Sequence, residues 1–273
     1  MTADPTYRGF ALDAETALAL LQWQAELGAD EPCLDAPLDR YALSDRTETP
    51  SAAPAAAPPA RSAATPRDEG ENLVAQAETM AASATTLAEL AAAQEAFDGI
   101  ELKKGARNFC FSDGNPGARV MIIGEAPGEE EDRQGRPFVG RAGQLLDQMF
   151  GAIGLSRTAV DAEKALYITN VLTWRPPGNR RPEPAEIAMM MPFLTRHVEL
   201  VQPQLLVLMG NTPCIAALNR QGILKLRGTW TTAFGLPALP MAHPAYLLRT
   251  PLAKREAWAD LLSLSARLED LAG

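Results

Sequence analysis

Three segments of the sequence bring polar side chains together with glycine or proline, and their groups could take part in chemistry. The first segment, residues 124–140, reads GEAPGEEEDRQGRPFVG. The second begins at Thr169-Asn170 and continues as WRPPGNR over residues 174–180. The third, residues 243–249, reads HPAYLLR. Carboxylates, a carboxamide and an imidazole can form hydrogen bonds with a polar ligand, and the first and last of these can also transfer protons.

The loop at residues 124–128 and the carboxamide of Asn170 each have two interpretations. Two glycines and a proline after a strand give a tight turn whose backbone can approach a ligand closely, but α/β enzymes of many kinds have such turns. Asn170 at a strand end can offer a donor and an acceptor to a ligand, or it can cap a turn. Neither segment identifies a function by itself.

The sequence has two histidines, and only one is placed for chemistry. His197 falls within a helical pattern, near its end. His243 ends an apolar strand and precedes a proline, and histidine is the side chain that changes protonation near neutral pH. We therefore take His243 as the candidate catalytic residue; the alternative is a structural histidine that caps a turn.

From residue 118 onward, short apolar runs alternate with helical patterns. Such runs are typical of buried parallel strands. The predicted strands are residues 119–124, 165–170, 204–210 and 236–243, and the predicted helices are residues 141–153, 184–200, 211–219 and 251–269. This alternation predicts an α/β fold, a three-layer αβα sandwich with a central, mainly parallel four-stranded sheet. Ligands bind beyond the carboxyl ends of such strands, so the three polar segments predict one site.

The first hundred residues have a different composition. Four large apolar residues share one helical face: Leu12, Leu20, Trp23 and Leu27. Residues 12–28 are therefore expected to form a short amphipathic helix within an N-terminal helical segment, residues 1–46. Residues 47–72 alternate Ala and Pro, which predicts a disordered linker. Residues 73–100 are expected to hold a helix that stops at Asp98-Gly99 and leads into a domain of residues 101–273.

The net charge of the chain is −9, but it is unevenly distributed. Residues 1–100 contain 5 Lys and Arg against 17 Asp and Glu, which gives −12 and leaves +3 for residues 101–273. A mildly basic domain is compatible with phosphate contact. The acidic N-terminal region should repel bare DNA, so it is either a contact region for a protein partner or a solvated appendage.

The sequence favours a cytoplasmic protein. It has no run of 18 apolar residues, so we expect no membrane span, and its first ten residues lack the basic and apolar regions of a secretory signal. Its cysteines, Cys33, Cys110 and Cys214, are odd in number and widely spaced, which argues against a disulfide framework. We also expect a monomer.

The three segments, in this order and spacing, resemble the family-4 uracil-DNA glycosylases. In that family the first segment runs Gly-Glu-(Ala/Gly)-Pro-Gly and continues to Pro-Phe-Val-Gly. The second is Asn followed by Arg-Pro-Pro, and the third is His-Pro-(Ala/Ser) with Leu and Arg. The resemblance extends from about Phe97 to Leu268 and includes Arg227-Gly228. It implies a repair enzyme that flips uracil out of DNA and hydrolyses its N-glycosidic bond.

The resemblance also implies which residues bind the base. Ala126 and Phe138 would line the site, with the Phe138 ring stacked on the flipped uracil. Asn170 would donate to O4 and accept from N3–H, and cytosine would leave these buried groups unpaired. Glu131 would lie near C5 and exclude the methyl group of thymine.

Catalysis and DNA contact follow from the same resemblance. His243 would donate a hydrogen bond to O2 of the departing uracil. Glu125 or Asn170 would hold the attacking water, unless the reaction rests mainly on stabilising the leaving group. Leu247 or Leu248 would wedge into the vacated base stack. Phosphate contacts are expected at arginines that could equally be a solvated surface: Arg175, Arg180, Arg181 and Arg249.

Family-4 enzymes usually carry a 4Fe–4S cluster held by four cysteines, and this sequence departs from that pattern. When Leu102, Arg175 and Pro192-Phe193 are aligned on the family, large apolar residues stand at the four cysteine positions: Phe97, Ile100, Trp174 and Met190. None of the three cysteines falls in a ligand position, and such clusters need thiolates. We therefore predict no metal and no cofactor, with apolar packing in place of the cluster.

Two other functions are compatible with parts of the sequence. The chain could be a non-catalytic damaged-DNA-binding or polymerase-associated relative of the glycosylases. The joint presence of Glu131, Phe138, Asn170 and His243 favours an enzyme instead. A nucleotide-binding Rossmann enzyme is disfavoured because the sequence lacks Gly-x-Gly-x-x-Gly. The sequence ranks neither uracil against other deaminated bases nor single- against double-stranded DNA.

Overall fold

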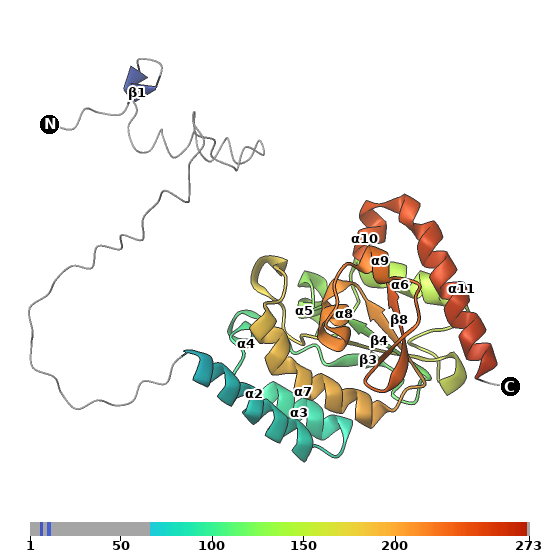
Figure 1. Cartoon of the computed structure of the whole chain (residues 1–273), viewed down its shortest axis with the longest axis horizontal. Coiled ribbons are helices and arrows are strands. Elements are labelled where there is room, and N and C mark those ends of the chain that lie inside the picture. Colours follow the sequence, from blue (N-terminus) through green and yellow to red (C-terminus); the bar gives the residue numbers. More distant parts are fainter. Residues whose placement is uncertain (1–5, 8–9, 12–65, 272–273) are drawn as a thin grey trace, which may run out of the picture. The chain divides into compact units, whose positions relative to one another are not determined.

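The computed structural model of the chain describes residues 6–7, 10–11 and 66–271 (Figure 1). The chain divides into two units, residues 1–60 and residues 61–273. The described part of the first unit is an antiparallel pair of strands, β1 (Thr6–Tyr7) and β2 (Phe10–Ala11). The helix expected within residues 12–28 lies outside the described residues, as does most of the predicted linker, and both stay predictions.

The second unit is built on a six-stranded sheet with the order β3-β5-β4-β6-β8-β7. The four inner strands are parallel and confirm the four predicted strands: β4 (Val120–Gly124), β5 (Leu166–Asn170), β6 (Leu205–Met209) and β8 (Leu236–Met241). Two edge strands, β3 (Ser112–Gly114) and β7 (Thr231–Ala233), run antiparallel to their neighbours. They correct the predicted strand number, and they escape prediction because neither has an apolar run.

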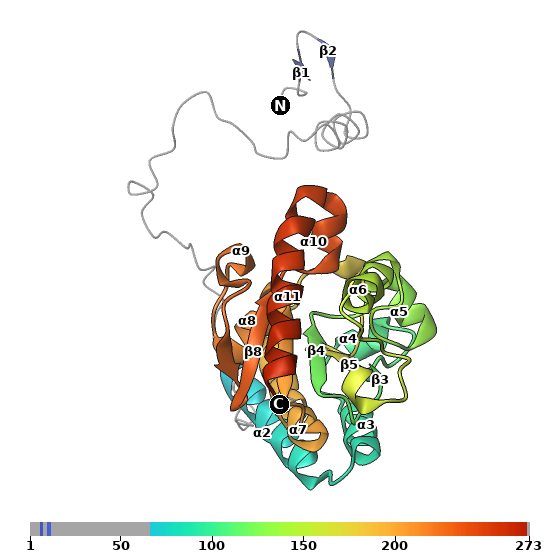
Figure 2. The same ribbon diagram turned by 90° about the vertical axis from the view of Figure 1, so that its right-hand side faces the viewer.

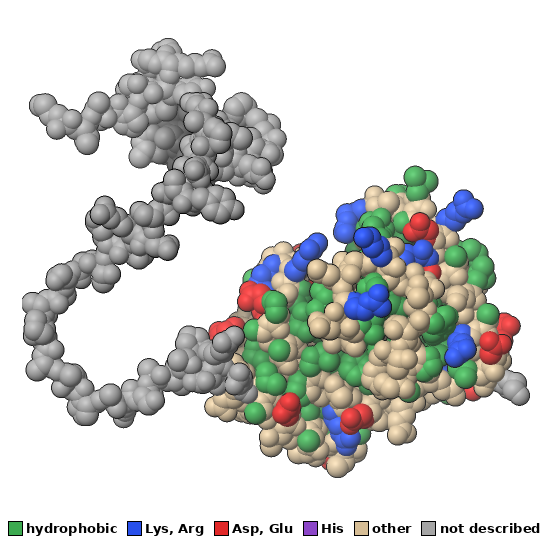
Figure 3. Space-filling view, viewed as in Figure 1, with side chains coloured by type: hydrophobic (Ala, Val, Ile, Leu, Met, Phe, Trp, Pro, Cys, Tyr) green, Lys and Arg blue, Asp and Glu red, His purple; other side chains and the backbone are tan. Residues whose placement is uncertain are grey.

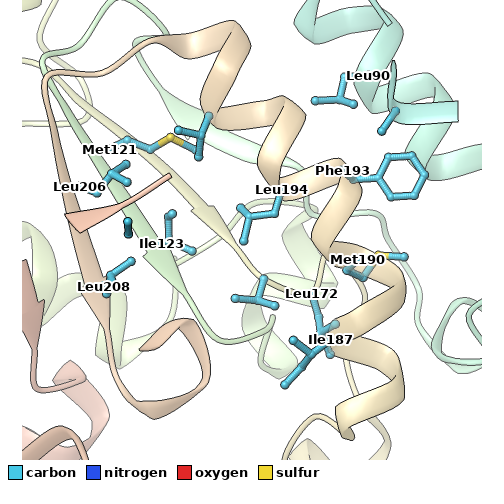
Figure 4. Packing of buried hydrophobic residues seen from close by; sticks show 14 of the residues in the cluster. Leu90, Met121, Ile123, Leu172, Ile187, Met190, Phe193, Leu194, Leu206 and Leu208 are labelled. Carbon is cyan, nitrogen blue, oxygen red and sulfur yellow. The ribbon is translucent and has the colours of Figure 1, made fainter. Parts of the chain in front are cut away.

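One face of the sheet packs against α7 (Pro184–Val201). Every second side chain of an inner strand belongs to this core, including Met121 and Ile123 of β4 (Figure 4). The opposite side of α7 contacts α2 (Pro66–Ser83) and α3 (Leu87–Ala96), and Figure 4 shows Phe193 of α7 pointing toward this second helical layer. Because α7 is apolar on both sides, the helices beyond it belong to the same compact unit.

The other face of the sheet packs against α6 (Arg141–Gly151) and α11 (Lys254–Asp270). Val120 and Ile122, the alternate residues of β4, point into this core and meet Phe150 of α6. Parallel strands that are covered on both faces are apolar at every position, which explains the uninterrupted apolar runs in the sequence. The predicted three-layer αβα sandwich is confirmed.

The single helix predicted for residues 73–97 is two helices, α2 and α3. The first of them begins at Pro66, inside the predicted linker. Thr86 separates the two helices because its hydroxyl caps α3: it accepts from Glu89 N–H, while the Glu89 carboxylate accepts from Thr86 N–H. Such a reciprocal cap starts a new helix and therefore ends the previous one.

Short helices follow the carboxyl ends of the inner strands. α5 (Glu129–Gln134) follows β4, α8 (Asn211–Leu218) follows β6, and α10 (Pro244–Arg249) follows β8. In Figure 2, α10 lies at the end of α11 that is remote from the C-terminus. The remaining short elements are α4 (Leu102–Gly105), α9 (Ile223–Leu226) and three 3-10 turns, η1 (Ala162–Lys164), η2 (Pro177–Asn179) and η3 (Pro251–Ala253). Within the residues that the structure describes, none of the helices has the length and apolarity needed to cross a bilayer.

Candidate active site

The parallel sheet brings Gly124 and Asn170 side by side at the ends of β4 and β5, where they are register partners. Asn170 is buried, and its Oδ1 is a buried oxygen without a hydrogen-bond partner among the described residues. A Cβ on Gly124 would overlap both Asn170 Oδ1 and the ring of Phe138. Gly124 is therefore the residue that lets these two side chains meet, and the free oxygen leaves an acceptor for a ligand.

Phe138 and His243 form the aromatic part of the same site. Their ring centroids are 5.4 Å apart and their planes are inclined by 27°. The backbone of Phe138 has φ of +54°, a left-handed conformation that is uncommon for an aromatic residue. Such conformations persist only where the surrounding structure holds them, and they concentrate at functional sites.

Glu131 is hydrogen-bonded to the backbone of its own loop. Its Oε1 accepts hydrogen bonds from the backbone N–H groups of Val139 (2.9 Å) and Gly140 (2.8 Å), and its Oε2 accepts from Gly128 N–H (3.2 Å). Both carboxylate oxygens are thus engaged with the backbone at the two ends of the loop. Glu131 therefore closes the loop that presents Phe138, and its steric role at C5 stays a prediction.

His243 is the N-cap of α10, and its hydrogen bonding selects one tautomer. Its Nδ1 accepts from Ala245 N–H at 3.1 Å, so the proton of the neutral ring is on Nε2. Burial, with a smaller effect of the positive Arg249, lowers the pKa of His243 to about 4. The imidazole is therefore neutral at pH 7 and retains an Nε2–H donor. Gly210, at φ of +104°, lies beside it, and a Cβ there would touch His243 Cβ at 3.4 Å.

Glu125 follows Gly124 and is held by a residue that lies outside the three polar segments. The hydroxyl of the buried Thr212, in the first turn of α8, donates to Glu125 Oε2 at 2.6 Å. Thr212 lies two residues after Gly210, at the end of β6, so the rule that ligands bind beyond the strand ends would have found it. Ala126 follows in the same loop and is partly buried; its contact with a base stays a prediction.

The structure separates the two candidate wedge residues. Leu247 is 0% exposed and packs with Ala242, Ala253 and Ala257, whereas Leu248 is 37% exposed. An insertion residue must reach the DNA from the surface, so these exposures favour Leu248 over Leu247. Insertion by either leucine stays a prediction.

The arginines of the second segment are engaged within the protein to different degrees. Arg180 donates to both carboxylate oxygens of Glu186, at 2.9 and 2.6 Å. Arg175 donates to Asn179 Oδ1 at 2.8 Å. Arg249 is exposed and, among the described residues, has no acidic partner within 4 Å. The phosphate role is therefore best supported at Arg249 and least at Arg180.

His197, the second histidine, belongs to the core and not to the site. Its ring stacks on Phe111, with centroids 4.4 Å apart, and Nε2 lies 2.9 Å from the hydroxyl oxygen of Tyr167. Burial lowers the pKa of His197 to about 3. The choice of His243 as the candidate for chemistry is consistent with these surroundings.

The arrangement at the strand ends can be compared with known proteins. A sequence model of the Uracil DNA glycosylase superfamily matches residues 111–262. A type-4 uracil-DNA glycosylase of Archaeoglobus fulgidus is 44% identical over 171 residues, which are 59% of this chain and 82% of that protein. One of Thermotoga maritima is 40% identical over 147 residues, 52% of this chain and 72% of that protein. The chain belongs to the uracil-DNA glycosylase superfamily and is type-4-like.

A relative of another kind is a DNA polymerase. A DNA polymerase of Bacillus phage SP01 is 30% identical over 156 residues, which are 57% of this chain but 16% of the polymerase. A segment like the glycosylase domain thus forms a small part of that much longer protein. The type-4 relatives, which match over most of their length, support a uracil-DNA glycosylase enzyme in general.

The residues at the family's four cluster positions do not fit a 4Fe–4S cluster. All four side chains are buried and share one apolar core: Phe97, Ile100, Trp174 and Met190. They offer no thiolate, and among residues 66–271 no group of three or more His, Cys, Asp or Glu is placed to hold a metal ion. Cys110 and Cys214 are buried and unpaired, and burial raises the pKa of each thiol to about 12.

Proposed function

We propose that the protein releases uracil from DNA by binding the flipped base at the strand ends and hydrolysing its N-glycosidic bond, which leaves an abasic site. The observation that carries this proposal is the unpartnered Oδ1 of Asn170 beside the Phe138 ring and the neutral His243. An acceptor, an aromatic surface and a donor are the groups that a flat base with alternating carbonyl and N–H groups requires.

Asn170 would distinguish uracil from cytosine. Its Oδ1 would accept from uracil N3–H, and its amide N–H would donate to O4. Cytosine has an acceptor at N3 and a donor at N4, so it would leave two buried polar atoms of the complex unpaired. Each such atom costs about 1–3 kcal/mol, which is enough to reject the wrong base.

His243 would stabilise the departing base. When the C1′–N1 bond breaks, the electron pair stays with uracil and negative charge collects at O2. The Nε2–H of His243 can donate to this oxygen, because Nδ1 is occupied by Ala245 N–H. A neutral imidazole suits this task, since it can stabilise the oxyanion by donating a hydrogen bond, without a change in its own protonation state.

Glu125 would position the attacking water. Thr212 fixes Oε2 of the carboxylate, and among the described residues Oε1 has no hydrogen-bond donor. Oε1 can accept a proton from a water that forms the new C1′–O bond. Asn170 is the alternative water ligand, but in this scheme its amide is already occupied by the base.

DNA would lie across the surface near α10. Leu248 and Arg249 are exposed there, and Lys254 and Arg255 follow in the first turn of α11, also exposed. Figure 3 shows basic side chains gathered over the part of the domain where Figure 1 draws α9 and α10. Leucine can open a base step, while Arg and Lys hold the flanking phosphates.

We further propose that the enzyme works as a monomer without an iron–sulfur cluster. Apolar side chains fill the positions from which the family's cysteines would reach a cluster, and Gln94 Nε2 lies 3.5 Å from the Met190 sulfur within that core. Packing of this kind can stabilise the junction of α3, α7 and the segment after β5 directly. The cytoplasmic location and a protein partner for the acidic N-terminal region stay predictions.

The proposal is tested by incubating the full-length protein with single- and double-stranded oligonucleotides that carry one uracil, followed by alkali. Strand cleavage at the uracil position, with release of free uracil, is expected from the wild type. Tight binding to uracil-containing DNA without release would favour the non-catalytic alternative. If the protein neither binds uracil-containing DNA nor releases uracil, the assignment of the site to DNA is overturned.

A further inference from the structure

The stacking residue Phe138 is held in its left-handed conformation by two charged side chains. The Glu131 carboxylate accepts from the N–H groups of Val139 and Gly140, the two residues that follow Phe138. Arg157, which lies outside the loop, binds the other side of the same peptide segment: Nη1 donates to Pro137 O at 3.0 Å and Nη2 donates to Phe138 O at 2.9 Å. The carbonyls and the N–H groups around Phe138 are thus fixed from opposite sides.

Arg157 is itself held firmly. Its Nε donates to Asp147 Oδ1 at 2.8 Å, and its Nη1 donates to Asp113 Oδ2 at 3.1 Å. Its side chain is 9% exposed, so the guanidinium is a buried cation with two carboxylates and two carbonyls around it. A planar fork of donors can hold two neighbouring carbonyls in one orientation, which a lysine ammonium cannot do in the same way.

The Phe138 peptide and ring are also tightly packed by their neighbours. Gly143, in the first turn of α6, lies so close to the Phe138 carbonyl that a Cβ there would overlap it. The ring of Phe138, on the other side, fills the space above Gly124 and faces His243. A rotation of the Phe138 peptide would therefore turn the ring out of the place where it meets Asn170 and His243.

We propose that Arg157 is a positioning residue: it holds the Phe138 backbone so that the ring forms the stacking surface for the flipped base. The expected effect of Arg157 on catalysis rests on the proposed function, whereas its expected effect on the position of the Phe138 ring does not. Without the two guanidinium bonds, Phe138 can relax from positive to negative φ, which non-glycine residues favour. A displacement of about 1 Å at such a surface is enough to slow a reaction on the order of 100-fold.

Arg119 provides a matched control. Its side chain is 10% exposed, and it donates to Gln204 Oε1 at 2.7 Å, to Leu268 O at 3.0 Å and to the carboxylate of Glu163. It precedes β4, at the end of the sheet opposite the site. R119Q and R157Q therefore each remove a buried guanidinium with side-chain and backbone partners, but only R157Q removes bonds to the Phe138 segment.

The experiment has one readout for the ring and one for the reaction. The full chain is labelled with 4-fluorophenylalanine, and the fluorine resonance of Phe138 is assigned from its loss in F138L. We expect R157Q, and to a smaller extent R157K, to shift or broaden this resonance, while R119Q leaves it in place. R157K keeps the buried charge and gives a folded protein if R157Q does not fold.

In the second readout, single-turnover uracil release is expected to fall on the order of 10- to 100-fold in R157Q and to be unchanged in R119Q. The inhibition constant of free uracil should rise about tenfold in R157Q alone, since stacking is weakened. Equal effects of R157Q and R119Q, or an unchanged Phe138 resonance in folded R157Q and R157K, would overturn the positioning role. Failure of the wild type to release uracil would overturn the proposed function. The fluorine spectra would still show whether Arg157 positions the Phe138 ring.

Discussion

The strand-end site and the four-residue apolar group of Phe97, Ile100, Trp174 and Met190 lie in the same α/β unit, and they differ in the chemistry of their side chains. The site keeps a buried carboxamide oxygen without a partner, a neutral imidazole and a carboxylate. The apolar group has no thiolate at any of its four positions, and its buried polar atom without a partner among the described residues is Trp174 Nε1, a donor only. We infer that the chemistry resides in the loops at the strand ends, while the four positions of the apolar group contribute by packing.

The largest effect is expected in the apolar group. Phe97→Ala removes a fully buried ring that packs on Phe193, with centroids 5.6 Å apart, and should lower the free energy of unfolding by about 3–5 kcal/mol. Uracil release per folded molecule should be unchanged at a temperature where the variant is native. Urea unfolding and single-turnover rates measure the two quantities. A loss of activity in excess of the loss of folded protein would show that the apolar group contributes to the site.

The converse is expected for His243→Ala. Removing the Nε2–H donor should slow uracil release by about 10²–10³-fold, the cost of losing one oriented oxyanion donor. The stability should change much less than in Phe97→Ala, because His243 is only partly buried. Single-turnover rates at saturating enzyme measure the effect. A decrease of less than a few-fold would remove His243 from the mechanism and leave it as the cap of α10.

The sequence predicts the polar site better than it predicts how the site is held together. Apolar runs that end in Gly124, Asn170 and His243 predict both the inner strands and the place where they converge. The short edge strands β3 and β7 have no such run. The role of Glu131 depends on a loop that doubles back, so that Val139 and Gly140 meet its carboxylate; no spacing rule indicates this.

Two neighbouring residues show a second limit. Leu247 and Leu248 are the same residue type in adjacent positions, and only the packing of α10 against α6 and the start of α11 decides which one is buried. Arg157 gives a third case, because its carbonyl partners are about 20 residues away in the chain. Tertiary contacts of this kind are not visible in local patterns.

Two histidines, His243 of the site and His197 of the core, should make the stability depend on pH. His243 and His197 have pKa values of about 4 and about 3 in the folded protein, below the ordinary value of 6.5. The unfolded chain therefore binds more protons below pH 6.5, and the free energy of unfolding should fall as the pH decreases from 6.5 toward 4. In His197→Gln this fall should be less steep, as measured by urea unfolding at several pH values. Identical slopes for the two proteins would contradict the burial of a neutral His197.

The smallest effect is expected at the DNA surface. Leu248→Ala should slow uracil release from double-stranded DNA by about tenfold, since an apolar wedge opens the base step, and should affect single-stranded DNA less. Its stability should be near that of the wild type. Leu247→Ala is the matched control: it should lower the free energy of unfolding by about 2–5 kcal/mol, because Leu247 is fully buried. Equal slowing on both kinds of DNA would argue against a wedge at Leu248.

We propose that this chain releases uracil with the strand-end site alone, without an iron–sulfur cluster. The most direct test quantifies iron in the purified full-length protein and measures uracil release by the same sample. We expect far less than one iron per chain, no absorbance band of an iron–sulfur cluster, and full activity. About four irons per chain with such a band, or an iron-free protein that releases no uracil until a cluster is restored, would contradict it.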